Sequence, residues 1–206
     1  MIHSGVTQGT PHNIPFGAGV YFAGIEYSET VAPTEEAVKA ALIGATQDGG
    51  TTTITPEFFD IPADDVLVLV EELKQKVGEK ATMETSFIEL TAEMVKNQAI
   101  GKLGETTDKN FDVITSDDHL RSGHFYKGFG YWGHHIDGRE MIILFKKALC
   151  TSGYSGETKS KQNTVFKGTF ECHSDIEYGV TKLPYAIFIR KKDGWTAVNA
   201  DEVATA

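Results

Sequence analysis

Four histidines lie close together in the sequence, and they are the first residues whose chemistry needs weighing: His119, His124, His134 and His135. A metal site needs two or three such rings to converge, each held by further partners. Adjacent His134 and His135 on a strand point to opposite faces, so at most one of them could join a given site. The spacing matches no helical zinc pattern. We therefore expect ordinary surface or loop histidines, with no metal.

Nucleophilic and phosphate chemistry has no better support. The sequence contains no Gly-x-Ser-x-Gly elbow. Gly17-Ala18-Gly19 lies within an expected strand rather than between a strand and a helix, so it does not form a phosphate loop. The carboxylate pairs Asp64-Asp65, Glu71-Glu72 and Asp117-Asp118 are sequence neighbours, which is typical of solvated charge. We expect a protein that is not an enzyme and that binds no cofactor.

The charge of the chain excludes one large class of partners. Its 206 residues include 19 Lys and Arg against 29 Asp and Glu, a formal charge of −10. Residues 1–100 hold five lysines against fifteen carboxylates, whereas residues 101–206 hold fourteen of each sign. Binding to a phosphate backbone depends on cations that release counterions, and this chain lacks the surplus. We therefore do not expect a protein that binds nucleic acid specifically.

Composition narrows the class further. A hydrophobic fraction of 40% is too high for a disordered chain. The aliphatic run at residues 66–70 is far shorter than the roughly 20 residues of a membrane helix, so no membrane insertion is expected. No secretory signal is visible at the start. Cys150 and Cys172 are too few for a disulfide scaffold and are expected to be buried thiols in a reducing compartment.

The elements that must position the side chains are mostly strands. Period-two alternation and turn residues predict strands at 14–27, 51–60, 80–90, 165–173 and 184–190, and a hairpin over 131–150 with a type I′ turn at Asp137-Gly138. Short helices are expected after Thr34 and Thr91, which can cap them. Residues 47–50 are expected to be a turn, and 101–124 and 152–163 polar loops.

The segment 64–76 fits either a helical stripe or a strand, and we favour a strand because of its β-branched run. There is no internal repeat and no linker. The prediction is one domain over residues 1–206, an all-β sandwich or barrel with one or two short flanking α-helices.

Three pairs of consecutive aromatic residues lie in expected strands, at 58–59, 125–126 and 131–132. Because side chains alternate along a strand, one ring of each pair must be covered by something other than the core it adjoins. Exposed rings mark subunit contacts, whereas helices covering a second face would bury them within the chain. Subunit contacts are favoured, and the candidates are Phe59, Phe125, Tyr126, Tyr131 and Trp132.

Several segments, in order, carry a family resemblance. They are residues 16–22, the Gly-rich turn at 49–51, the passage from Thr51–Ile61 to Lys80–Thr91 that ends in Glu-Leu-Thr, and the strands at 141–150, 165–173 and 184–188. The chain resembles the major tail (tail tube) proteins of long-tailed bacteriophages and prophages, over about residues 14 to 190.

The resemblance implies a tail-tube-like fold in which six copies close into a ring and the rings stack into a tube that conducts the genome. It also implies a location in the virion tail after assembly in the bacterial host cytoplasm. The partners it implies are further copies of the chain, a tape measure protein, a tail terminator, and genomic DNA that passes through without specific binding.

A tube wall must let a duplex with one negative charge per roughly 1.7 Å slide without adhering. Six chains at −10 would bring 6 × (−10) = −60 per ring, acting within a Debye length of about 10 Å. Carboxylates and hydroxyls suit such a wall, although Lys167 shares a face with two of the candidates. The expected lumen residues are Thr53, Thr55, Glu57, Glu84, Ser86, Thr169 and Glu171.

Contacts between stacked rings are expected from the polar loops, about 102–124 and 152–163, and from terminal arms at 1–13 and 192–206. Two other tube readings and two other classes stay open. The chain could form the tube of a contractile tail or of a secretion or bacteriocin-type injection machine. It could instead be a monomeric carbohydrate-binding module using Trp132 as a platform, or, more distantly, a hydrolase using the histidines between His119 and His135.

Overall fold

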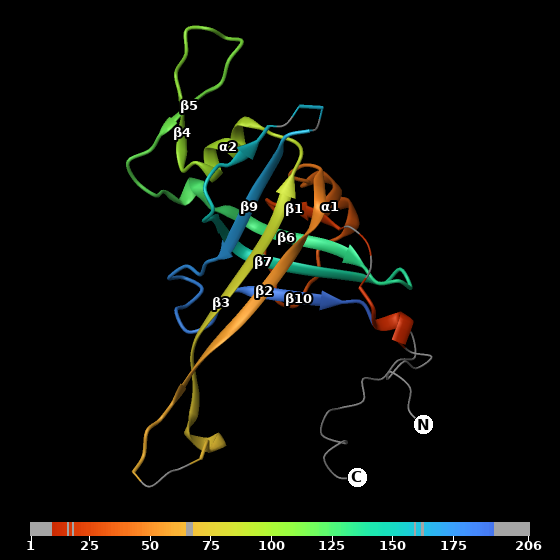
Figure 1. Cartoon of the computed structure of the whole chain (residues 1–206), viewed down its shortest axis with the longest axis vertical. Coiled ribbons are helices and arrows are strands. Elements are labelled where there is room, and N and C mark those ends of the chain that lie inside the picture. Colours follow the sequence, from red (N-terminus) through yellow and green to blue (C-terminus); the bar gives the residue numbers. More distant parts are fainter. Residues whose placement is uncertain are drawn as a thin grey trace.

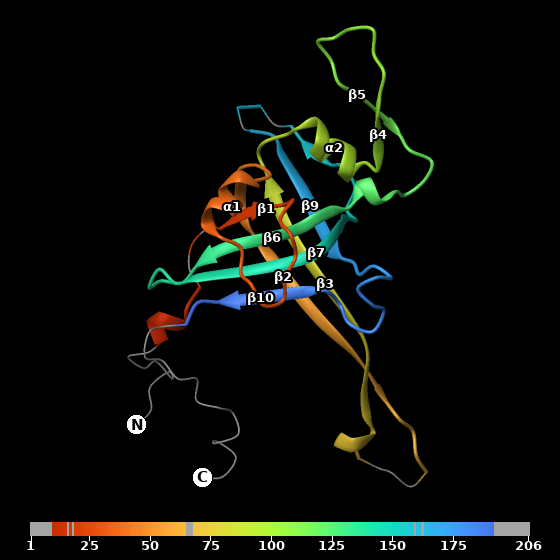
Figure 2. The same cartoon turned by 180° about the vertical axis from the view of Figure 1, so that it is seen from behind.

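Two β-layers with crossing strand directions enclose the main core (Figures 1 and 2). The computed structural model describes residues 10–15, 17, 19–64, 68–158, 160–161 and 163–191. The first layer, called here the open layer, contains β2 (Thr46–Asp60), β3 (Lys74–Phe87), β9 (Val165–Cys172) and β8 (Gly156–Glu157). The second, the covered layer, contains β1 (Val20–Phe22), β6 (Tyr126–His134), β7 (Glu140–Cys150) and β10 (Tyr185–Ile189). All pairings are antiparallel, which confirms the all-β prediction.

Strand β7 joins the two layers because it changes partner along one edge. Its residues 141–145 pair with β10, whereas its residues 148–150 pair with β9 of the open layer. Its other edge pairs with β6 over residues 140–148. The sheet therefore folds over at β7 and closes the main core between its two halves.

The main core is aromatic and lies between the layers. Alternate residues of β3 and β9 enter it, including Phe87, Phe166 and Phe170, as the period-two pattern predicted. Phe129 of β6 stacks on Phe170 with ring centroids 4.3 Å apart. Cys150 and Cys172 are both free and buried, which confirms the expectation of two buried thiols.

A second, smaller core lies on the far side of the covered layer. Helix α1 (Glu35–Ala40) places Val38 against Phe22, Trp132 and Leu144 there. Both faces of β6 and β7 are consequently buried, so an apolar run such as Ile142–Phe145 needs no alternation.

The two helices begin where the sequence predicted. Thr34 accepts the amide N–H of Ala37 at the start of α1, and Thr91 accepts that of Met94 at the start of α2 (Ala92–Gln98). Each cap satisfies one of the free N–H groups of a helix start. Met94 enters the main core, so α2 closes one end of it.

Several boundaries differ from the predictions. The strand expected at 14–27 is limited to β1, and Phe16 and Ala18 lie outside the described residues. Asp48 and Gly49 do not end a strand: with φ of 65° and 71° they form a bulge inside β2. The polar loop after α2 contains a hairpin, β4 (Gly101–Gly104) and β5 (Val113–Ser116), because its apolar island pairs with the residues that follow the helix.

Two further expectations are wrong in detail. The β6–β7 hairpin is present, but of Asp137 and Gly138 it is the glycine that has a positive φ, 83°, so the turn is not type I′. The segment 68–73 is not a strand: it is irregular and then forms the 3₁₀ turn η2 (Glu71–Leu73). Further 3₁₀ turns are η1 (Thr10–Asn13) and η3 (Ser122–His124).

Beyond the sheet, β2 and β3 continue as a two-stranded arm. Strand β9 pairs with β3 over residues 82–87, whereas β2 pairs with β3 as far as Asp60 and Lys74. In Figures 1 and 2 this hairpin, residues 56–78, projects from the body at the end opposite to α2 and the β4–β5 hairpin. We call it the arm.

Candidate functional site

The open layer has one polar, solvent-facing side, defined by strand register. Thr53 of β2 pairs with Thr82 of β3, which pairs with Glu171 of β9. Directly paired residues share a face, and the neighbouring register positions alternate with core residues. We call this side the polar face.

All seven candidate lumen residues lie on the polar face. Glu84 pairs with Thr169 across β3 and β9, and the remaining candidates follow at alternate positions. Four of them are exposed and three are half-buried. The exposed ones are Thr53, Thr55, Glu57 and Glu84, and the half-buried ones are Ser86, Thr169 and Glu171.

The polar face is mixed in charge rather than purely acidic. Lys80 lies on it and forms an ion pair of 3.2 Å with Glu171. Lys167 pairs in register with Ser86 and lines a shallow hollow of about 280 Å³ together with Glu84. The carboxylates of Glu57, Glu84 and Glu171 outnumber these two lysines by one.

Much of the negative charge lies on the arm instead. Residues 56–78 hold six carboxylates against two lysines, a balance of −4. The arm also exposes apolar side chains: Val68 is 74% and Leu69 is 81% exposed, and Phe58 and Phe59 are each more than half exposed. An apolar surface of this kind marks an interaction site. The sequence analysis did not predict that residues 68–69 are exposed, because the β-branched run to which they belong suits an internal strand equally well.

The structure corrects two of the five interface candidates. Tyr126 is buried in the main core, and Trp132 is buried in the second core beneath α1. They are covered within the chain because the covered layer has apolar contacts on both faces. Phe125 and Tyr131 are half-buried, and Phe59 on the arm is exposed. The burial of Trp132 also removes the platform of a carbohydrate-binding module.

No known family model matches the chain, and no curated protein matches it in sequence. Among solved structures, the chain is similar to a chain of the "Virion of native gene transfer agent (GTA) particle". The TM-score is 0.40 at 6% sequence identity, and the match covers 82% of this chain and 95% of that chain.

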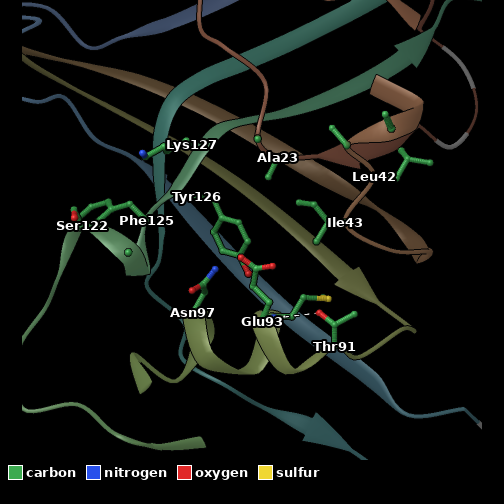
Figure 3. A pocket seen from close by; sticks show the side chains of 15 residues that line it. Ala23, Leu42, Ile43, Thr91, Glu93, Asn97, Ser122, Phe125, Tyr126 and Lys127 are labelled. Atoms are coloured by element: carbon green, nitrogen blue, oxygen red, sulfur yellow. Dashed lines mark hydrogen bonds between the residues drawn. The ribbon is translucent and has the colours of Figure 1, made fainter. Parts of the chain in front are cut away.

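A hollow of about 640 Å³ lies between α2, the end of β1 and the start of β6 (Figure 3). Its ionisable lining groups are Glu93, Tyr126 and Lys127. Burial raises the pKa of Tyr126 above its usual range, so its hydroxyl stays protonated.

The histidines are placed apart. His124 is buried, and its Nε2 lies 3.0 Å from the carbonyl oxygen of Gly101, whereas His119 is exposed. His134 is exposed and His135 is buried, on opposite faces as expected for neighbours in an extended chain. Among the described residues, no group of three or more His, Cys, Asp or Glu side chains could hold a metal ion. No helix in the described part of the chain is long and apolar enough to span a bilayer.

The turn that leads from β5 to β6 contains a buried carboxylate. Arg121 donates to both oxygens of Asp117, from Nε at 2.8 Å and from a terminal nitrogen at 3.2 Å. The Asp117 side chain is 2% exposed, and the guanidinium of Arg121 holds its pKa well below the usual range.

Because folding lowers this pKa, ionised Asp117 stabilises the protein above about pH 4, and this contribution is lost as the pH falls further. We expect Asp117→Asn to lower the melting temperature at pH 7 and to differ progressively less from the natural protein below pH 4. Thermal unfolding followed by circular dichroism from pH 7 to pH 3 measures this difference. The exposed Asp112→Asn is the matched control and should show no such pH dependence.

Proposed function

We propose that the chain is a structural, non-catalytic tube protein of a virion tail: copies join side by side into rings, the rings stack, and DNA passes through the bore. The observation that carries this proposal is the polar face together with the edges that flank it. Strand β2 ends the open layer on one side, and β8 ends it on the other. Among the described strands, no further strand pairs with either of these outer edges.

Two different free edges of one layer favour head-to-tail association. If β2 of one copy pairs with the opposite edge of the next, the open layers form one continuous sheet. A heterologous contact of this type closes into a ring when the rotation per copy allows it. The polar faces would then form one common wall, and six copies are the number that the family resemblance implies.

The composition of the polar face suits a bore. Hydroxyls give no charge for phosphates to bind, and Lys80 is already paired with Glu171. The remaining surplus of one carboxylate repels a duplex over about one Debye length. DNA can therefore pass without the counterion release that would trap it.

The arm suits the contact between successive rings. It projects parallel to the strands of the open layer, away from the body (Figure 1). Its exposed apolar residues and its free strand edges need a partner. The polar loops at 102–124 and 152–163 remain predicted ring contacts, and the terminal segments 1–9 and 192–206 lie outside the described residues.

Negative-stain microscopy of the purified, concentrated protein tests the proposal. Hollow rings or tubes are the expected result, and the proposal covers tubes with or without a sheath. A monodisperse 22.5 kDa particle at all accessible concentrations would contradict it.

A charge variant tests which face lines the bore. We expect tubes of Thr53→Lys/Glu84→Lys to retain duplex DNA that is protected from nuclease, with retention falling steeply as salt rises. The measurement is co-sedimentation with DNA followed by nuclease digestion. Glu35→Lys/Glu36→Lys on α1 adds cations on the far side of the chain and is the control: any DNA it binds should remain nuclease-sensitive. Equal protection by both variants would place the polar face outside the bore.

A further inference from the structure

The turn before β10 presents the most exposed apolar pair of the described residues. Ile176 is 90% and Val180 is 85% exposed, more than any other large apolar side chain in that part of the chain. Glu177, between them in sequence, is also exposed. We call residues 174–180 the knob.

The knob is held in place by many contacts at its base. Asp175 accepts the amide N–H of Tyr178 at 2.8 Å and forms ion pairs with Lys146 and Lys147 at 3.1 and 2.9 Å. The ammonium of Lys146 also lies 4.6 Å from the ring centroid of Tyr178. The hydroxyl of Ser174 donates to the carbonyl of Gly179 at 2.7 Å.

A second element fastens the knob from outside. Tyr178 donates to Glu29 of the segment before α1, and its ring packs edge-on against Tyr27 at 5.9 Å. Lys182 pairs with the same Glu29 carboxylate at 2.7 Å. A turn fixed in this way loses little conformational entropy when it binds, so its exposed apolar tip is preorganised for a contact.

A complementary hollow lies at the other end of β10. It has a volume of about 380 Å³, and its apolar lining includes Ala32, Pro33, Trp132, Ile142, Ile187 and Ile189. Glu140 and Arg190 also line it and form an ion pair with each other, and the exposed Lys191 follows directly. The hollow thus combines apolar walls with an adjacent lysine, and the knob combines apolar side chains with Glu177.

The knob and the hollow lie at different ends of β10. Residues 181–184 lie between the knob and Tyr185, whereas the hollow lies along Ile187–Arg190, at the end of β10 and just after it. In Figure 1, β10 runs across the strands β2 and β3 of the open layer. A knob and a hollow at different places on one chain make a heterologous contact between copies.

We infer that the knob of one copy seats Ile176 and Val180 in the hollow of a second copy, with Glu177 facing Lys191 of that copy. This inference rests on the proposed ring assembly and names a lateral contact within the ring. It is distinct from the edge pairing of the open layer and from the arm.

Paired cysteines test the contact in the full chain. Ile176→Cys/Ile187→Cys, oxidised mildly after assembly, should give a ladder of covalent oligomers on a non-reducing gel that reductant removes. Each single variant alone should give no ladder, and a mixture of the two should stop at dimers. Cys150 and Cys172 are buried and do not compete. Leu42→Cys/Ile187→Cys, at an exposed residue outside the proposed contacts, is the control for random collision.

The outcomes separate the inference from the proposed function. Rings or tubes that form normally but show no more cross-linking than the Leu42 control would overturn the contact and leave the tube intact. Failure of the natural protein to assemble would overturn both. As a second measurement, Ile176→Ser/Val180→Ser should leave the melting temperature unchanged and raise the concentration needed for assembly at least about tenfold. Unchanged assembly would contradict the contact.

Discussion

Val68→Ser/Leu69→Ser is expected to fold normally and to form no tubes. The two side chains are 74% and 81% exposed, so their loss costs the isolated chain almost nothing. Burying each against a neighbouring copy would contribute about 1.5–3 kcal/mol. The pair therefore contributes about 3–6 kcal/mol per contact, which corresponds to a factor of about 10² to 10⁴ in affinity. Because every copy in a ring loses this contribution, stacking should fail.

Light scattering coupled to size exclusion, together with microscopy, measures this loss, and circular dichroism verifies the fold. Val68→Leu/Leu69→Val keeps the apolar area of the arm and is the matched control, which should assemble. Tubes of ordinary length from the serine variant would show that the arm tip does not join rings.

Period-two alternation predicted the polar face correctly because the open layer has one solvent-facing side and one side packed on the main core. On such a layer, polar residues at alternate positions identify the solvent face from sequence alone, as Lys167, Thr169 and Glu171 do on β9. The candidates on β2 and β3 lie on the same face, because β3 pairs in register with both β9 and β2, and directly paired residues share a face. The placement of these residues about a bore remains a prediction.

The same reasoning failed for Trp132 because it assumed one core-facing side for every strand, whereas Tyr126 is the ring of its pair that enters the main core. Helix α1 covers the second side of β6 and β7. The sequence of those two strands contains no feature that indicates a helix packed on that side. The helix itself was predicted, through Thr34, but not the layer against which it packs. Which element covers which face is a property of tertiary packing, so sequence patterns near Trp132 could not decide it.

The arm illustrates the opposite error. Exposed Val68 and Leu69 are apolar, and a sequence pattern expects apolar residues to be buried. Likewise, the exposed Ile176 and Val180 carry no periodic signal, because they lie in a turn. On the proposed assembly, other copies would complete these surfaces, which would then contradict the rules for a single chain, and these are the places where sequence patterns were least informative.

Gly128→Ala should be among the most destabilising single substitutions of the chain, although it adds a single methyl group. Gly128 has φ of 54°, and a Cβ there would lie 1.6 Å from the carbonyl oxygen of Ile25. The segment after β1 crosses β6 at this glycine, where the amide of Gly24 donates to the carbonyl of Lys127 at 2.6 Å. That crossing carries Ile25 into contact with the second core.

An L-residue at Gly128 would have to adopt the left-handed conformation, which costs about 1–3 kcal/mol of folding free energy. Its Cβ would in addition have to displace the backbone at Ile25. We expect a loss of at least about 3 kcal/mol in the free energy of unfolding, measured by urea denaturation. Gly123→Ala is the control, since a Cβ at Gly123 meets no atom within 4 Å. Equal stability of the two variants would mean that the crossing segment yields freely, in which case α1 and the second core could not hold the covered layer in a fixed shape for ring assembly.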